Sequence, residues 1–217
     1  MVFTEPSKKI QEFLKKHVSL PDFHLSKKAS AVMQKLYKQA IHAHSMTPNY
    51  SIVSDDQHSL PKGLPKGQSY DYMEKNIRNH IEGLKNRVTQ VVLTVKQRVY
   101  TIFFIIPVGT ASEIDNYVKW INTWLQVATL YVKSDCSKTV TVYLYLTDLK
   151  KVLPEKGGIA LNPMNANTAF TTSCQPKTEI ILYRREEWFK VFIHESFHNL
   201  GLDFAGENVK ETLFPIF

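Results

Sequence analysis

The sequence predicts an α+β protein in which a mixed or mostly antiparallel sheet is backed by helices. Three observations support this class. Short runs rich in β-branched and aromatic residues recur between residues 88 and 184, as expected for strands. Amphipathic patterns lie around them, so that the order is helix, strands, helix, strands, helix. A stretch punctuated by proline and glycine, "SLPKGLPKGQS" (59–69), separates this region from a lysine-rich N-terminal segment.

The N-terminal segment has the pattern of a basic helical arm. Residues 7–18 place apolar side chains at helical spacing opposite lysines, and residues 26–44 continue the pattern with Ser26 as a candidate N-cap. Residues 1–68 contain ten lysines, no arginine and five acidic residues. We therefore expect an arm and linker over 1–68 and a compact domain over 69–217. The charge favours an acidic protein, nucleic acid or a membrane surface as partner, and a solvated helix surface explains it equally well.

The compact domain begins with a predicted helix over 70–87, and Ser112 is the candidate N-cap of a longer helix that reaches about residue 132. The predicted strands are "VTQVVLTV" (88–95), "RVYTIFFII" (98–106), "TVTVYLYLT" (139–147), "TAFTTS" (168–173) and "TEIILYR" (178–184). The last strand leads directly into a helix that contains a recognisable motif.

The composition indicates a soluble intracellular protein. Hydrophobic residues make up 43% and charged residues 22%, which is ordinary for a globular chain. The first residues, "MVFTEPSKK", lack the apolar core of a secretory signal, and the most apolar run, 99–108, is too short to span a bilayer. The two cysteines, Cys136 and Cys174, lack the spacing of a zinc knuckle. We interpret them as reduced thiols, with a single disulfide as the alternative.

The stretch "FIHESFHNLGLDF" (192–204) contains the residues with the clearest chemistry. His194 and His198 are four residues apart, so on a helix both imidazoles lie on one face and can bind one metal ion. Glu195 is placed to accept a proton from a metal-activated water and to return it to a leaving amine. Gly201 is placed to end the helix. This pattern predicts Zn2+ as cofactor and Glu195 as the catalytic base.

The motif also resembles that of a known family. "VFIHESFHNLG", after a strand ending in "EIILYR", resembles the active-site helix of the zincin metallopeptidases. "HESFHNLGLDF" is similar to the zinc metallopeptidases that large double-stranded DNA viruses encode. The resemblance implies a helix-backed sheet whose edge strand, "TAFTTS" or "TEIILYR", binds an extended peptide above the zinc by strand addition. If the protein is viral, it implies a place in the host cytoplasm or the virion.

A catalytic zinc takes three protein ligands, and the sequence leaves the third open. The family pattern HExxHxxGxxH/D has its glycine at Gly201, but its last position is Phe204. Asp203 is one residue short of that position, and Glu207 and Glu211 follow further along the chain. We rank Asp203 first, then Glu207, then a ligand outside the chain, while Glu211 is better explained as a solvated acid.

Three functions are compatible with these features. The first is a zinc-dependent metallopeptidase that hydrolyses a peptide or protein substrate. The second is a catalytically inactive, zincin-like structural or virion-associated protein, which the basic arm and the open third ligand favour. The third, a nucleic-acid-binding module that uses the arm, is weaker because the arm lacks arginine, the better reader of bases.

Overall fold

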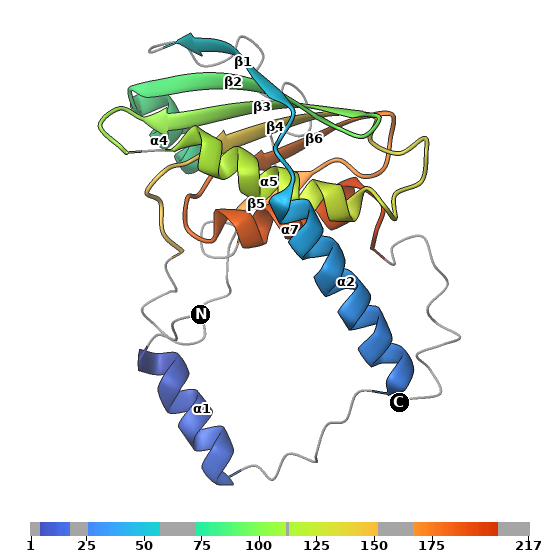
Figure 1. Cartoon of the computed structure of the whole chain (residues 1–217). Coiled ribbons are helices and arrows are strands. Elements are labelled where there is room, and N and C mark those ends of the chain that lie inside the picture. Colours follow the sequence, from blue (N-terminus) through green and yellow to red (C-terminus); the bar gives the residue numbers. More distant parts are fainter. Residues whose placement is uncertain (1–4, 18–25, 57–72, 112, 152–166, 204–217) are drawn as a thin grey trace. The chain divides into compact units, whose positions relative to one another are not determined.

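The computed structural model describes residues 5–17, 26–56, 73–111, 113–151 and 167–203 (Figure 1). The chain divides into two compact units, Met1–Lys38 and Gln39–Phe217. The first unit contains two lysine-rich helical segments, and the second contains the sheet and the motif.

The first unit holds helix α1 (Glu5–His17) and the beginning of helix α2 (Lys27–Ser45). The Ser26 hydroxyl accepts a hydrogen bond from the Ala29 amide at 3.1 Å, so the predicted N-cap is confirmed. On α1, Ile10 and Phe13 are exposed although they mark its apolar face. Over the described ranges of the chain, no helix is both long and apolar enough to cross a membrane.

The second unit is built on a six-stranded sheet with the order β1-β2-β3-β4-β6-β5. The strands are β1 (Tyr50–Asp56), β2 (Asn86–Val95), β3 (Arg98–Pro107), β4 (Thr139–Tyr145), β5 (Ala169–Thr171) and β6 (Lys177–Leu182). Strands β3, β4 and β6 pair in parallel, whereas β1–β2, β2–β3 and β5–β6 are antiparallel pairs. The predicted α+β class with a mixed sheet is therefore confirmed.

Helices cover both faces of this sheet. Helices α5 (Ile114–Ala128) and α7 (Trp188–Asn199) lie on one face, and α4 (Lys75–Gly83) lies on the other (Figure 1). Side chains along β3 point alternately to the two faces of the sheet, and each face has its own hydrophobic core. Ile102 and Phe104 pack with α5 and α7, whereas Ile105 packs with α4. The motif helix is thus fixed against a fully buried apolar layer. The N-cap of α5 is Glu113, one residue after the predicted Ser112, which itself lies outside the described residues.

Strand β1 extends the compact unit toward the N-terminus. It pairs with β2 from Tyr50 to Asp56, although the sequence pattern places these residues in the arm and linker. Residues 51–55 are exposed, with the apolar Ile52 and Val53 among them, and within the described residues β1 pairs on one side only. The compact unit begins at Gln39, whereas the sequence suggests a boundary at 68/69. The predicted linker, 59–69, lies outside the described part of the chain.

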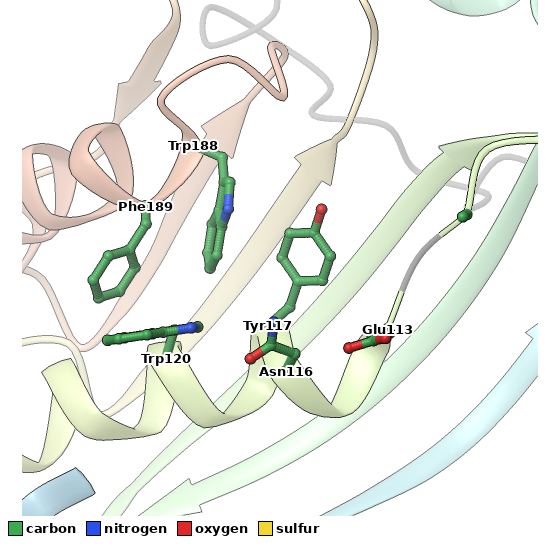
Figure 2. Close-up of a pocket in the computed structure, with 7 residues that line it drawn as sticks. Glu113, Asn116, Tyr117, Trp120, Trp188 and Phe189 are labelled. Atoms are coloured by element: carbon green, nitrogen blue, oxygen red, sulfur yellow. The ribbon is translucent and has the colours of Figure 1, made fainter. Parts of the chain in front are cut away.

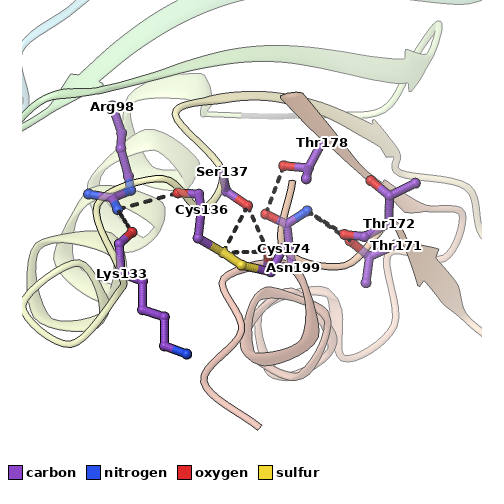
Figure 3. Close-up of a disulfide and its surroundings, with 9 residues drawn as sticks. All are labelled: Arg98, Lys133, Cys136, Ser137, Thr171, Thr172, Cys174, Thr178 and Asn199. Atoms are coloured by element: carbon purple, nitrogen blue, oxygen red, sulfur yellow. Dashed lines mark hydrogen bonds between the residues drawn. A yellow bond between two sulfur atoms is a disulfide. The ribbon is translucent and has the colours of Figure 1, made fainter. Parts of the chain in front are cut away.

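The two cysteines form a disulfide, which corrects their interpretation as reduced thiols. Their Cα atoms are 4.8 Å apart across a sequence separation of 38 (Figure 3). The reason lies in the sheet register, which pairs Thr139 of β4 with Lys177 of β6. Each cysteine stands three residues before its member of that pair, so the parallel strands bring the two side chains together. The pairing removes the cysteine-based argument for a reducing compartment.

Candidate functional site

Helix α7 presents the histidine pair at its C-terminal end. His194 and His198 are one turn apart, and their rings lie 4.9 Å apart, nearly at right angles to each other. The two Nε2 atoms face each other at 3.3 Å. Two imidazoles on successive turns of one helix therefore converge on a single point.

The separation of the two Nε2 atoms suits a tetrahedral metal. Zinc–imidazole bonds measure about 2.0–2.1 Å, and two such nitrogens at the tetrahedral angle would lie roughly 3.3 Å apart. The distance between the nitrogens of His194 and His198 is 3.3 Å. A direct hydrogen bond between the rings fits the same distance. The two nitrogens could therefore serve as two ligands of one metal ion.

Asp203 contacts the opposite side of the His198 ring. Its Oδ2 accepts a hydrogen bond from the His198 Nδ1 at 2.6 Å. A neutral imidazole with its proton on Nδ1 keeps a lone pair on Nε2, directed toward His194. In metal sites, carboxylates in this position fix the tautomer and the orientation of a ligating histidine. Asp203, our first choice for the third ligand, thus lies where it can orient His198.

The backbone turn after α7 brings Asp203 into this position. The Gly201 amide donates to the His198 carbonyl at 3.1 Å, and the Leu202 amide donates to the Phe197 carbonyl at 2.8 Å. This is a Schellman motif, which needs a residue in the left-handed region, and Gly201 has φ of +61°. The predicted end of the helix at Gly201 is therefore confirmed. The reversal returns the chain along the last turn, beside His198.

Glu195 lies next to the pair in a half-buried position. Burial raises the pKa of its carboxyl above the usual value, and the charges of His194 and His198 partly oppose this rise. A carboxyl whose pKa is closer to neutral both accepts and returns protons effectively. Its position and its electrostatics suit a general base.

A cleft of about 360 Å³ lies beside His194 and Glu195. Its walls come from the segment after β4, from the beginning of β5 and the residues before it, and from α7 with its N-cap. The lining residues are Lys151, Asn167, Thr168, Ala169, Glu187, Lys190, Val191, His194 and Glu195. Both lysines lie within 4 Å of the Glu187 carboxylate, so the charges in this cleft are largely balanced.

Asn199 fastens the C-terminal end of α7 to the sheet (Figure 3). Its side chain is fully buried and accepts a hydrogen bond from the Thr178 hydroxyl at 3.2 Å. Its amide donates to the Thr171 hydroxyl and to the Thr172 carbonyl, both at 3.0 Å. The Asn199 carbonyl accepts from the Ser137 hydroxyl at 2.6 Å. These contacts fix the motif helix against β5 and β6.

A second contact fixes α7 against α5. The Trp124 Nε1 donates to the buried Ser196 hydroxyl at 2.6 Å, and that hydroxyl donates to the Ile193 carbonyl at 2.7 Å. The sequence shows Ser196 and Asn199 only as uncharged residues near the motif. Their buried setting depends on which helix and which strands surround α7. Sequence spacing therefore gives no signal for these supporting contacts.

The third metal ligand is not found among the residues with defined positions. Within those ranges, no group of three or more histidine, cysteine, aspartate or glutamate residues is arranged to hold a metal ion. Glu207 and Glu211, the other acids considered for this role, lie outside the described residues. The structure thus brings together His194, His198 and Glu195 and places Asp203 behind His198.

Comparisons with known proteins provide no relative for this chain. No family model, no curated protein and no solved structure matches it. Any functional conclusion must therefore come from the residues themselves.

Proposed function

We propose that this chain is a zinc-dependent metallopeptidase that hydrolyses peptide bonds, with His194 and His198 as zinc ligands and Glu195 as the base. The principal observation is the convergence of two Nε2 atoms at 3.3 Å, beside a half-buried carboxylate in the wall of a cleft. A zincin-like fold is part of the same proposal. Its support is that α7 follows β6 and lies against β5, an antiparallel strand at the end of the described sheet.

The chain's own residues would divide the chemistry among them. A zinc ion bound by the two histidines would supply a Lewis acid that polarises the scissile carbonyl and acidifies water. Glu195 accepts the proton of the attacking water and gives it to the amine that leaves. Asp203 holds His198 in the tautomer whose Nε2 lone pair faces the metal.

Strand β5 provides the basis for a peptide substrate. It pairs with β6 on one side and terminates the sheet among the residues that the structure describes. An extended peptide could pair with its outer edge through main-chain hydrogen bonds, which require no particular side chains. Ala169 of this strand lines the same cleft as Glu195. A peptide bond held along β5 would thus lie close to the base.

The test measures zinc and hydrolysis separately in the full-length chain. We expect the parent to bind one zinc ion and to cleave members of a mixed, quenched fluorescent peptide library. Glu195→Gln should bind zinc equally well but lose about 100-fold or more of the cleavage rate, since the base is removed and both ligands remain. Glu82→Gln, on the helix that covers the other face of the sheet, is the matched control and should cleave like the parent. Equal cleavage by Glu195→Gln and the parent would exclude Glu195 as the base.

An inactive, zincin-like structural protein is the second candidate. It is favoured by the observation that the described residues offer two zinc ligands and no third. In that case the parent chain would cleave no member of the library at any zinc concentration. A chelator would then change its thermal stability without changing any reaction.

Binding to polyanions through the N-terminal unit is a separate property that either candidate can have. Three lysines on α1 are exposed: Lys9, Lys15 and Lys16. Exposed positive charge is what binding to nucleic acid or to an acidic partner requires. We propose it as an accessory property, because this segment has lysines but no arginine, which is the better reader of bases.

A further inference from the structure

A second pocket, of about 440 Å³, lies between α5 and the beginning of α7 (Figure 2). It is lined by Ala111, Glu113, Asn116, Tyr117, Trp120, Trp188 and Phe189. Four of these seven residues are aromatic, and a single acid, Glu113, stands among them. The proposed chemistry at His194 uses none of them.

This pocket is separate from the histidine site. Phe189 and His194 are five residues apart on α7, which places them roughly 140° apart around the helix axis. The residues that line the two pockets also differ completely. A ligand in the aromatic pocket would therefore bind independently of the proposed peptide hydrolysis.

The rings form open walls instead of a closed stack. Trp120 and Phe189 lie 5.4 Å apart between centroids with planes tilted by 54°, and Tyr117 and Trp188 lie 4.7 Å apart with a tilt of 52°. Rings inclined in this way cannot cover one another's faces completely. Figure 2 shows the ring planes turned at different angles around a common space. Trp188 and Phe189 are also in contact, with centroids 5.3 Å apart and a tilt of 53°, so the four rings form one continuous aromatic wall of the pocket.

The exposure of Trp120 also indicates a binding surface. Its side chain is 41% exposed, although it lies between His44, with rings 5.3 Å apart, and Phe189. Burying an indole ring usually contributes more to stability than leaving it in solvent. The ring is instead held in place by neighbours on both sides while one part remains open to the pocket.

Glu113 supplies the charge. It is exposed at the N-cap position of α5, and its side chain makes no capping hydrogen bond there. On α5, Glu113, Asn116, Tyr117 and Trp120 have the spacing that places them on one face. Arg185 lies close enough to Tyr117 to lower the pKa of its hydroxyl, while burial raises that pKa more strongly. Tyr117 lies between Trp120 and Glu113 on this face, so a cation held by the rings would have the Glu113 carboxylate at one end of the pocket.

We propose that this pocket is an aromatic cage that binds an organic cation bearing a quaternary or methylated ammonium group. Faces of tryptophan and tyrosine attract such cations within about 6 Å of the ring centroid, and aromatic cages for choline and methyl-lysine use this interaction. The Glu113 carboxylate adds charge complementarity at the rim. Free choline-like molecules and methylated lysine side chains share this chemistry.

The experiment is a calorimetric titration of the full chain with two compounds of nearly equal shape. Choline carries the charge, and 3,3-dimethylbutan-1-ol is its neutral isostere. We expect choline to bind about tenfold more tightly than the alcohol. A trimethyl-lysine peptide, compared with its unmethylated form, distinguishes a protein-borne cation from a free one. Equal binding of choline and the alcohol would show a merely apolar pocket, and binding of neither compound nor of the methylated peptide would reject the cage.

Two variants and a control locate the binding. Trp120→Leu should weaken choline binding about tenfold, because the most exposed ring is lost. Glu113→Gln should weaken it severalfold and, being exposed, cannot disturb the core. Tyr131→Leu changes another exposed aromatic outside the pocket and should bind like the parent. Parent-like binding by both pocket variants would overturn the assignment, and the cleavage assay reports on the histidine site independently.

Discussion

Replacing Asn199 by alanine tests how the motif helix is held. The asparagine side chain makes three hydrogen bonds of 3.0–3.2 Å to β5, β6 and the segment after β5, and a longer one of 3.4 Å to the Glu179 carbonyl. Each buried hydrogen bond contributes about 1 kcal/mol net, so the variant should lose roughly 3 kcal/mol of unfolding free energy. For a chain of this length, such a loss corresponds to a fall of about 6–12 °C in Tm.

Asn122 provides the matched control. Its exposed fraction is 1%, compared with 0% for Asn199. Among the described residues, its side chain makes one hydrogen bond, a long contact of 3.4 Å from Gln126. Asn122→Ala should therefore cost about 1 kcal/mol or less. Urea unfolding of both variants, followed by circular dichroism, gives the two free energies. If Asn199→Ala loses no more than Asn122→Ala, the network around Asn199 does not fix α7 and our reasoning about its role is wrong.

Two further predictions concern the neighbourhood of α7. Removing the disulfide by a double Cys136→Ser, Cys174→Ser substitution should lower the unfolding free energy by roughly 4 kcal/mol, as the chain-entropy relation gives for a separation of 38 residues. A reductant should lower the Tm of the parent but not that of the variant. A parent whose Tm does not change with reductant would contradict the disulfide. If zinc binds as proposed, Asp203→Ala should weaken its affinity about 10–100-fold, and Asp203→Asn should weaken it less because the amide oxygen still accepts from His198. Zinc affinity is measured with a competing chelator. If Asp203→Asn loses as much zinc affinity as His198→Ala, Asp203 is itself a ligand.

The sheet was largely predictable because its strands are strongly apolar. The predicted runs 98–106 and 178–184 differ by at most two residues at either end from Arg98–Pro107 and Lys177–Leu182. The helix expected to reach residue 132 ends at Ala128. Apolar character continues beyond that point, but Leu130 and Tyr131 are exposed. Hydrophobicity alone does not show where a helix stops when the next apolar residues belong to a turn.

Other features depend on relations between distant residues. Strand β1 has no regular alternation of apolar and polar residues, and its pairing with β2 shows only in the fold. The disulfide follows from the register between β4 and β6, which no local pattern reveals. The spacing of His194 and His198 does predict that their rings share a helix face. The contact between Asp203 and His198 requires the turn at Gly201, where the chain reverses.

The position of the disulfide also affects the order in which the sheet can assemble. Strands β2 and β3 are separated by two residues, so this hairpin forms from local contacts within microseconds. Strands β4 and β6 pair in parallel across a long connection, and such non-local pairing is slow. Once formed, a bond between Cys136 and Cys174 would hold the beginnings of both strands together even when their pairing is broken. Because α7 follows β6, the same bond would limit how far the helix that carries His194 and His198 can move from the beginning of β4.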